Sequence, residues 1–205
     1  MKHVLLTSFE PFGGLPVNSS LEVGRAVRDR PPPEIVIDWL VLPVVASQCG
    51  RKAWEHVEGS LLVLALGQAA GAAALRLERR AVNFSDFSIP DNSGVRLCKK
   101  RIARDGPLSY PATAPVSQLA RTLQERRLPV ELSDSAGTYV CNHLYYDLLH
   151  RSARSGAPHA TLFVHLPLLP EQVPEQQRDK MPSRPLEELA EGVRVVIEAC
   201  VGKRG

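Results

Sequence analysis

The sequence lacks an apolar stretch long enough to cross a membrane. Its longest apolar run of the strand type, from Leu61 to Leu66, is far shorter than the roughly 20 residues that a transmembrane helix needs. The opening MKHVLLTSFE reaches an acidic residue before the core of a signal peptide could form. We therefore expect a cytoplasmic protein that does not associate with a membrane.

The chain also lacks a large excess of charge of one sign. Its formal net charge is +3 over 205 residues, and no Lys/Arg cluster is interleaved with aromatic residues, so we expect no nucleic-acid partner. With 44% hydrophobic and 23% charged residues, the composition is that of an ordinary soluble protein. The length predicts a single domain, 1–205, that buries about 70% of its unfolded surface.

Cysteine is scarce and scattered. The chain has four cysteines and no C-x-x-C pair, which argues against a zinc site, and a cytosolic setting argues against disulfides. Cys49, Cys98 and Cys200 are each expected to be small, buried, apolar side chains. Cys141 differs, because it follows the turn-forming run SDSAGT and falls in the first turn of a predicted helix.

Strand and helix signals alternate along the chain. Strands are predicted over 3–8, 34–41, 61–66, 130–133 and 161–165. Helices are predicted over about 18–30, 46–58, 115–127, from just before Cys141 to about 152, and 186–200. Segment 67–114 contains no clear element, and 170–185 is polar and proline-rich, hence a loop. This order is typical of an α/β fold, with a mainly parallel twisted sheet covered by helices on both faces.

Several polar or glycine-rich segments follow strands and so share one edge of the predicted sheet. They are FEPFGG at 9–14, GQAAG at 67–71, the turn before Cys141, and His165. Ligands of such sheets bind beyond the carboxyl ends of the strands. The N–H groups and dipole at a helix start favour an anion, but a reactive thiolate also needs a second cation, typically an imidazolium.

His165 is the best placed of the six histidines to supply that imidazolium, because its strand ends at the correct edge. His3 lies at the opposite edge, and His143, two residues from Cys141, faces another side of the helix. Solvated positions are expected for the remaining three, His56, His150 and His159. A third group should orient the imidazole, but the residues alone do not select it from 22 acidic side chains.

Together, several motifs resemble the pyrrolidone carboxyl peptidase family, also called pyroglutamyl-peptidase I. SAGTYVCNHLYY at 135–146 and FVHLP at 163–167 are similar to the family's cysteine and histidine motifs. The similarity extends to FEPFGG with Asn18, to GQAAG, to ERRAVN at 78–83 and to IPDN at 89–92. The motifs are collinear and span most of the chain.

The resemblance implies a cysteine exopeptidase that removes N-terminal pyroglutamyl residues from peptides through a thioacyl-enzyme intermediate. It maps the nucleophile to Cys141, the base to His165 and a third catalytic residue to Glu78, whose arginine neighbours would otherwise suggest a solvated surface charge. It also implies a three-layer α/β/α sandwich, no metal, no cofactor, a cytoplasmic location and a homo-oligomer, commonly a tetramer.

The substrate end would be a neutral five-membered lactam without a free α-amino group. Its pocket should therefore lack an acidic anchor and combine apolar faces with a few polar groups. Phe9 and Phe12 flank a tight turn and are implied to clasp the ring, with routine core packing as the alternative. The resemblance implies five further pocket positions, Asn18, Gln68, Ile89, Tyr139 and Val140. Asn18 has helix capping as its alternative role.

Two positions depart from the family pattern. Ser8 stands where glycine is frequent in the family, and Ser88 stands where arginine is common. If the mechanism needs the charge that this arginine would supply, another group must provide it. The N–H groups at the helix start around Cys141 are the favoured substitute, and the basic run of Arg76, Arg79 and Arg80 is the other.

Two other functions compete with the peptidase. The alternative enzyme is a cysteine amidase or acyltransferase that acts on a different acyl group. A nucleotide-binding module is disfavoured, because the glycine-rich turns lack the G-x-G-x-x-G spacing and the P-loop lysine.

Overall fold

The computed structural model describes residues 1–202, so the last three residues of the predicted 1–205 domain lie outside the described part. The strands of the main sheet lie in the order β2-β1-β3-β8-β4-β7. Their bounds are β1 (Lys2–Phe9), β2 (Ile35–Leu42), β3 (Leu62–Gln68), β4 (Leu75–Glu78), β7 (Val130–Ser133) and β8 (Ala160–Leu166). Strand β4 runs antiparallel to β8, and the other neighbouring strands described in this sheet run parallel.

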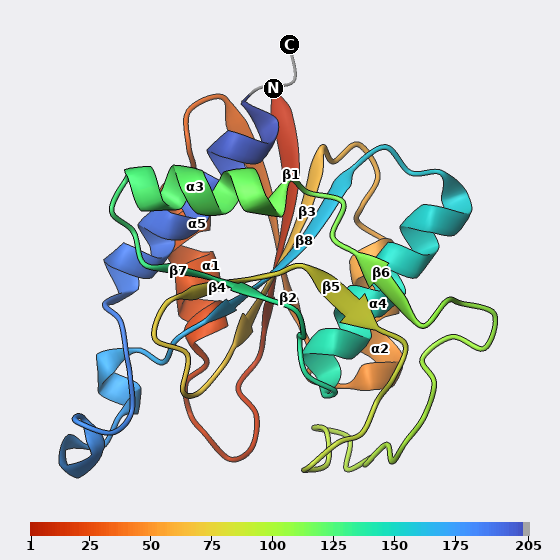
Figure 1. Ribbon diagram of the computed structural model, residues 1–205, viewed down its shortest axis with the longest axis horizontal. Helices are drawn as coiled ribbons and strands as arrows, with labels where there is room; N and C mark the ends of the chain where they lie inside the picture. The colour runs from red at the N-terminus through yellow and green to blue at the C-terminus, as the bar shows by residue number, and fades with distance from the viewer. Residues whose placement is uncertain (203–205) are drawn as a thin grey trace.

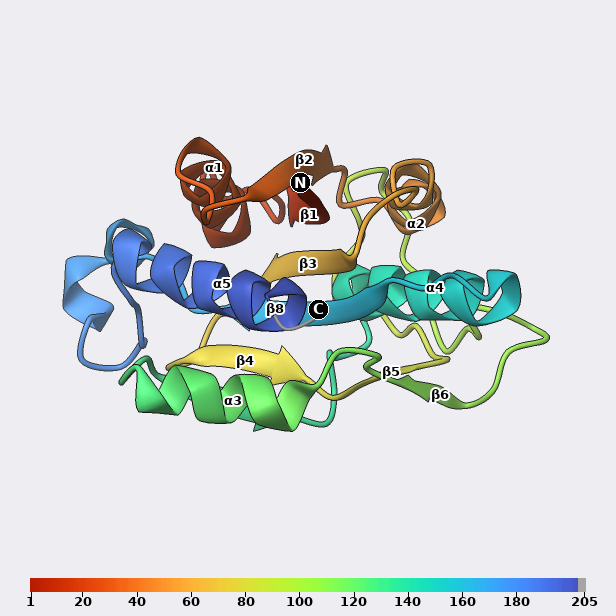
Figure 2. The same cartoon turned by 90° about the horizontal axis from the view of Figure 1, so that it is seen from above.

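Helices cover both faces of the sheet, as Figures 1 and 2 show. One face carries α1 (Ser19–Asp29), α3 (Val116–Glu125) and α5 (Leu186–Val201), and the other carries α2 (Ala46–Trp54) and α4 (Val140–Ser155). Each face has its own apolar core. Alternate residues of β1 feed the two cores, with Val4 and Leu6 on the α1 side and Leu5 and Phe9 on the α2 side. This arrangement confirms the predicted three-layer α/β/α class.

The segment from 67 to 114 contains more regular structure than predicted. Besides β4 it holds β5 (Arg80–Val82) and β6 (Ser109–Pro111), which pair with each other as a small antiparallel sheet. The prediction of an irregular middle was wrong there, because strands of three or four residues are too short to show a period in the sequence. The predicted loop at 170–185 holds two 3-10 turns, η1 (Pro170–Gln172) and η2 (Glu175–Gln177).

Some cysteine and histidine side chains differ in exposure from the prediction. Cys49 and Cys200 are buried as expected, but Cys98 is exposed, because it lies on a loop where no helix covers it. His150 and His159 were predicted to be solvated and are instead buried. His150 bonds to the Tyr110 hydroxyl at 3.0 Å and His159 to the Ser152 hydroxyl at 2.9 Å. None of the helices within residues 1–202 is long and apolar enough to cross a membrane.

Candidate active site

His165 and Glu78 lie on the sheet face that α4 covers. Val164 of β8 and Leu77 of β4 are paired across the two strands, and both belong to the core beneath α1 and α5. Successive side chains of a strand point to opposite faces, so the next residue of each strand points toward α4. Those residues are His165 and Glu78, which become diagonal neighbours because β4 and β8 run antiparallel.

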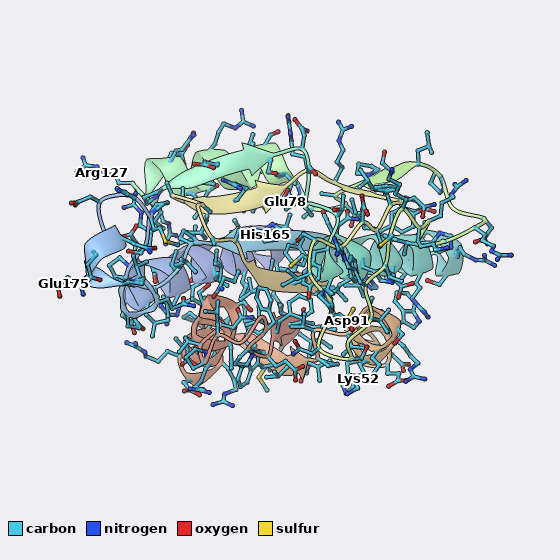
Figure 3. All side chains as sticks on the ribbon, turned by 90° about the horizontal axis from the view of Figure 1, so that it is seen from below. Lys52, Glu78, Asp91, Arg127, His165 and Glu175 are labelled. Atoms are coloured by element: carbon cyan, nitrogen blue, oxygen red, sulfur yellow. The ribbon has the colours of Figure 1, made fainter. Side chains whose placement is uncertain are left out.

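A short hydrogen bond joins the two side chains. His165 Nδ1 and Glu78 Oε1 are 2.7 Å apart, and Figure 3 shows the pair at the centre of the sheet. Glu78 is 0% exposed, and its Oε2 has no hydrogen-bond partner among the described residues. Because Nδ1 donates to this carboxylate, the ring orientation is set and Nε2 is left as the nitrogen available for chemistry.

Cys141 is the second residue of α4, within the first turn. The N-cap residue, Tyr139, makes no side-chain capping bond, so no cap of that kind competes for the first-turn N–H groups. The sulfur lies against β3 at Gly67, which is the register partner of His165. A Cβ atom on Gly67 would come within 3.0 Å of Cys141 Sγ and 2.7 Å of Phe163 Cζ. The bare glycine therefore makes room for the sulfur next to His165.

His165 interacts with both Cys141 and Glu78. Burial by itself lowers the pKa of His165, but hydrogen bonds and charge interactions with Cys141 and Glu78 outweigh burial and raise that pKa to about 9. The raised pKa favours the protonated imidazole, which is the form that pairs with a thiolate. Burial, aided by the charge of Asp147, raises the pKa of the Cys49 thiol.

His143 does not join this group. It lies on another side of α4 from Cys141, where its Nδ1 is 3.0 Å from the Ser85 hydroxyl. Burial lowers the pKa of His143. Within residues 1–202 no group of three or more His, Cys, Asp or Glu side chains is placed to hold a metal ion.

A small pocket opens beside Cys141. Its empty space is about 230 Å³, part of it open to solvent. Besides Cys141, the pocket is lined by Phe9, Phe12, Asn18, Val44, Gln68, Tyr139 and Val140. Ile89 is not among the lining residues, and its side chain is 41% exposed near Gly13. Val44 was missed, although it closely follows β2 at the same edge as FEPFGG.

The aromatic wall of the pocket is held by the IPDN segment. The Phe12 and Tyr139 ring centroids are 6.1 Å apart, and the Tyr139 hydroxyl donates to the Pro90 carbonyl at 2.9 Å. Glu10 Oε1 accepts from the Val44 N–H at 3.2 Å and from Asn92 Nδ2 at 2.8 Å. These bonds tie the 9–14 turn to the segment that supports Tyr139.

Asn18 and Gln68 are the amide side chains of the pocket. Asn18 Oδ1 accepts from the Ser20 N–H at 3.0 Å, so it caps α1, and Asn18 Nδ2 donates to the Glu10 carbonyl at 2.9 Å. Gln68 Oε1 accepts from the Ser19 N–H at 2.8 Å. Asn18 is thus both a helix cap and a pocket residue, and the two roles considered for it are compatible.

Asn142 was not singled out from the sequence, although it is fully buried beside the nucleophile candidate. Its Oδ1 accepts from the Val82 N–H at 2.9 Å, and its Nδ2 donates to the carbonyls of Val82 and Phe84, each at 2.9 Å. This amide joins the first turn of α4 to β5. A polar residue directly after Cys141, on the buried side of the helix, was the available signal.

The two departures from the family pattern lie outside the pocket lining. Ser8 Oγ accepts from Trp39 Nε1 at 3.1 Å and lies against Gly24 of α1. Ser88 is exposed. The basic run does not supply free charge there, since Arg76 pairs with Glu131, and Arg79 and Arg80 both pair with Asp134.

Comparison with known proteins identifies the family to which the chain belongs. The sequence matches the family described as pyroglutamyl peptidase over residues 2–203. It is 40% identical to the pyrrolidone-carboxylate peptidase of Vibrio vulnificus strain CMCP6, over 98% of this chain and 93% of that protein. The crystal structure of the pyrrolidone carboxyl peptidase from Fervidobacterium islandicum AW-1 is 39% identical and superposes with a TM-score of 0.91 over 97% of each chain. The Thermococcus litoralis pyrrolidone carboxyl peptidase is 33% identical, with a TM-score of 0.92 over 98% of this chain and 94% of that chain. The chain therefore belongs to the pyroglutamyl peptidase family of peptidases.

Proposed function

We propose that this protein removes N-terminal pyroglutamyl residues by cysteine catalysis, with Cys141 as nucleophile, His165 as acid and base, and Glu78 as the group that orients His165. The observation that carries this proposal is the imidazole between sulfur and carboxylate, beside a small pocket with no acidic side chain in its lining. A neutral lactam suits such a pocket, whereas the ammonium group of an ordinary peptide would find no anionic partner there.

The acylation step uses the thiolate–imidazolium pair. The Cys141 thiolate attacks the pyroglutamyl carbonyl carbon, and the carbonyl electrons move to oxygen, where first-turn N–H groups of α4 hold the oxyanion. When the tetrahedral intermediate collapses, the C–N bond breaks and His165 transfers its proton to the departing amine. The shortened peptide leaves and the pyroglutamyl group remains on sulfur as a thioester.

Deacylation reverses the role of the imidazole. The now neutral His165 takes a proton from water as that water attacks the thioester carbonyl. Collapse of the second intermediate breaks the C–S bond, so that pyroglutamic acid leaves and the thiolate–imidazolium pair is restored. Glu78 keeps Nε2 directed at the reacting atoms in both steps, because it holds Nδ1.

A comparison of naphthylamide substrates tests the proposed function. Pyroglutamyl-naphthylamide should be hydrolysed, and alanyl- and prolyl-naphthylamide should not, because the alanyl and prolyl groups carry a charged amine and no ring carbonyl. Absence of pyroglutamyl hydrolysis, together with hydrolysis or transfer of another acyl group, would favour the alternative amidase or acyltransferase.

We expect Glu78→Gln to move the alkaline limb of the pH profile of kcat/KM to lower pH. The raised pKa of His165 keeps its proton available up to about pH 9, and activity falls above that pH as the proton is lost. Glutamine keeps an acceptor for Nδ1 but removes the negative charge that raises the pKa of His165. The midpoint of the alkaline limb should therefore lie below about pH 9. Profiles of kcat/KM for both proteins check this. Glu131→Gln, at an exposed carboxylate paired with Arg76, is the control and should leave the limb in place. An unshifted limb in Glu78→Gln would contradict the role of Glu78.

We expect Phe12→Ala to lower kcat/KM for pyroglutamyl-naphthylamide by about tenfold or more. The change removes the aromatic face that packs on the substrate ring, and a loss of about 1.4 kcal/mol of binding free energy is a factor of ten. Alkylation of Cys141 by iodoacetamide should change far less, because the small reagent does not need the pocket. Phe84→Ala, at an exposed phenylalanine, is the matched control. Equal losses in hydrolysis and alkylation would instead indicate that Phe12 supports the core.

The location and the assembly state stay predictions. The family resemblance favours a cytoplasmic homotetramer, and sedimentation of the purified protein would measure its mass in solution.

A further inference from the structure

The amides of Gln68 and Gln172 form a pair in which only Gln68 lines the pocket beside Cys141. Gln68 belongs to β3 and lines the pocket, and Gln172 belongs to η1, in the segment that the sequence suggested was only a polar loop. Gln172 Nε2 donates to Gln68 Oε1 at 2.7 Å across a separation of 104 residues.

Two backbone N–H groups set the direction of every bond in this chain of amides. The Leu169 N–H donates to Gln172 Oε1 at 2.8 Å, so the other end of that amide is its NH₂ group. That Nε2 donates to Gln68 and also to the Val17 carbonyl at 3.2 Å. At the far end, the Ser19 N–H donates to Gln68 Oε1 at 2.8 Å. A backbone N–H can only donate, so neither amide can flip without placing two donors face to face.

The consequence is that the free polar atom of Gln68, a residue of the pocket lining, is the donor Nε2. Two donors fill the lone pairs of Gln68 Oε1, and Gln68 Nε2 makes no hydrogen bond to another residue within 1–202. A pocket with an N–H donor at this point favours a ring that carries a carbonyl oxygen. A five-membered lactam has such an oxygen, whereas a prolyl ring does not.

We propose that Gln172 is a positioning residue that locks the amide of Gln68 with Nε2 toward the pocket and thereby helps select a ring carbonyl. The proposal rests on the proposed function, because it assigns the lactam to this pocket. Gln172 itself need not touch the substrate. Its contribution is to the polarity of Gln68, so it should act on substrate binding and not on the chemistry at Cys141.

Gln172→Glu tests the direction of the amide chain. A carboxylate still accepts from the Leu169 N–H but faces Gln68 Oε1 and the Val17 carbonyl with an acceptor in place of a donor. A flip that turns Gln68 Nε2 toward the new charge and its oxygen toward the lactam gives up the bond from the Ser19 N–H, but the stronger hydrogen bond to a carboxylate offsets that loss. We expect KM for pyroglutamyl-naphthylamide to rise roughly ten- to a hundredfold with kcat within about threefold of wild type, the pattern of lost binding common to ground and transition states.

Gln177→Glu is the matched control, because it makes the same charge change on the same segment at an exposed side chain. It should leave KM within about twofold. The alkylation rate of Cys141 by iodoacetamide should be the same in wild type and both variants. Gln172→Leu, which removes one of two donors to Gln68 and adds no charge, should raise KM by roughly threefold and provides a readout if the glutamate variant does not fold.

The possible results separate this inference from the proposed function. Suppose that wild type hydrolyses pyroglutamyl-naphthylamide but Gln172→Glu has the same KM as Gln177→Glu. Gln172 then has no positioning role. The same conclusion follows if Gln172→Glu does not fold and Gln172→Leu has the KM of wild type. A fall in kcat and in alkylation rate without a change in KM would also overturn it. If wild type fails to hydrolyse the substrate at all, the proposed function fails and this inference fails with it.

Discussion

Cys141→Ser should lose nearly all hydrolysis of pyroglutamyl-naphthylamide and remain folded. Removal of the nucleophile from a peptidase whose catalytic residues act as a unit lowers kcat on the order of 10⁶-fold. A serine hydroxyl is a much weaker acid than a thiol, so the proton that His165 holds beside Cys141 would return to the oxygen. The first turn of α4 and the room beside Gly67 both accept the slightly smaller oxygen, so folding should be unaffected.

The other cysteines supply the controls for this experiment. Cys98→Ser is the cleanest, because Cys98 is exposed and the change touches no core. Cys49 is buried, so a serine there would place a hydroxyl in an apolar site at a cost of about 1–3 kcal/mol and should lower stability without abolishing activity. The measurements are kcat and the midpoint of thermal unfolding for each variant. Substantial hydrolysis by Cys141→Ala would show that Cys141 is not the nucleophile.

Replacing His165 with glutamine should lower kcat by at least about 10²- to 10⁴-fold, the contribution of a positioned acid–base group. The glutamine side chain can still donate a hydrogen bond to Glu78, whereas alanine has no donor. This matters because Glu78 is 0% exposed and its other oxygen is already without a partner among the described residues. Removing one member of a buried charge pair costs about 3–5 kcal/mol, so His165→Ala should both lose activity and unfold more easily.

The two effects of His165 can be separated by measuring kcat and the free energy of unfolding in parallel. His165→Gln should show the loss of kcat with the smaller loss of stability. His56→Gln is the control, because His56 is exposed and bonds only locally, to the Lys52 carbonyl at 2.9 Å. A His165→Gln protein with kcat within about tenfold of wild type would exclude His165 as the acid–base group.

Much of the fold was predictable because its signals are local. The continuous apolar run of β3 and the turn before α4 both showed in the sequence, as did the apolar stripe of α5. The position of His165 at a strand end also followed from order alone, since parallel strands bring their carboxyl ends to one edge. These features depend on periodicity and turn chemistry over a few residues, which a single sequence displays.

Other features were not predictable from local pattern. His150 and His159 are buried and bonded to Tyr110 and Ser152, and Cys98 is exposed on a loop. Of the implied pocket positions, Ile89 lies outside the lining, whereas Val44 belongs to it. In each case, exposure is decided by which segment happens to pack above the residue.

Glu78 and Gln172 show what the sequence determined and what it left to the tertiary structure. The sequence by itself determined the layered α/β class and the edge on which Cys141 and His165 lie, because strand and helix periods are properties of neighbouring residues. Composition and pattern indicate an exposed carboxylate among arginines at Glu78, and only the resemblance to known peptidases singles it out. Its place beside His165, 87 residues away, follows from an antiparallel strand of four residues. The link between Gln172 and Gln68 likewise depends on where a loop returns to the sheet. Such contacts form only when distant segments pack together, so the tertiary structure decides them.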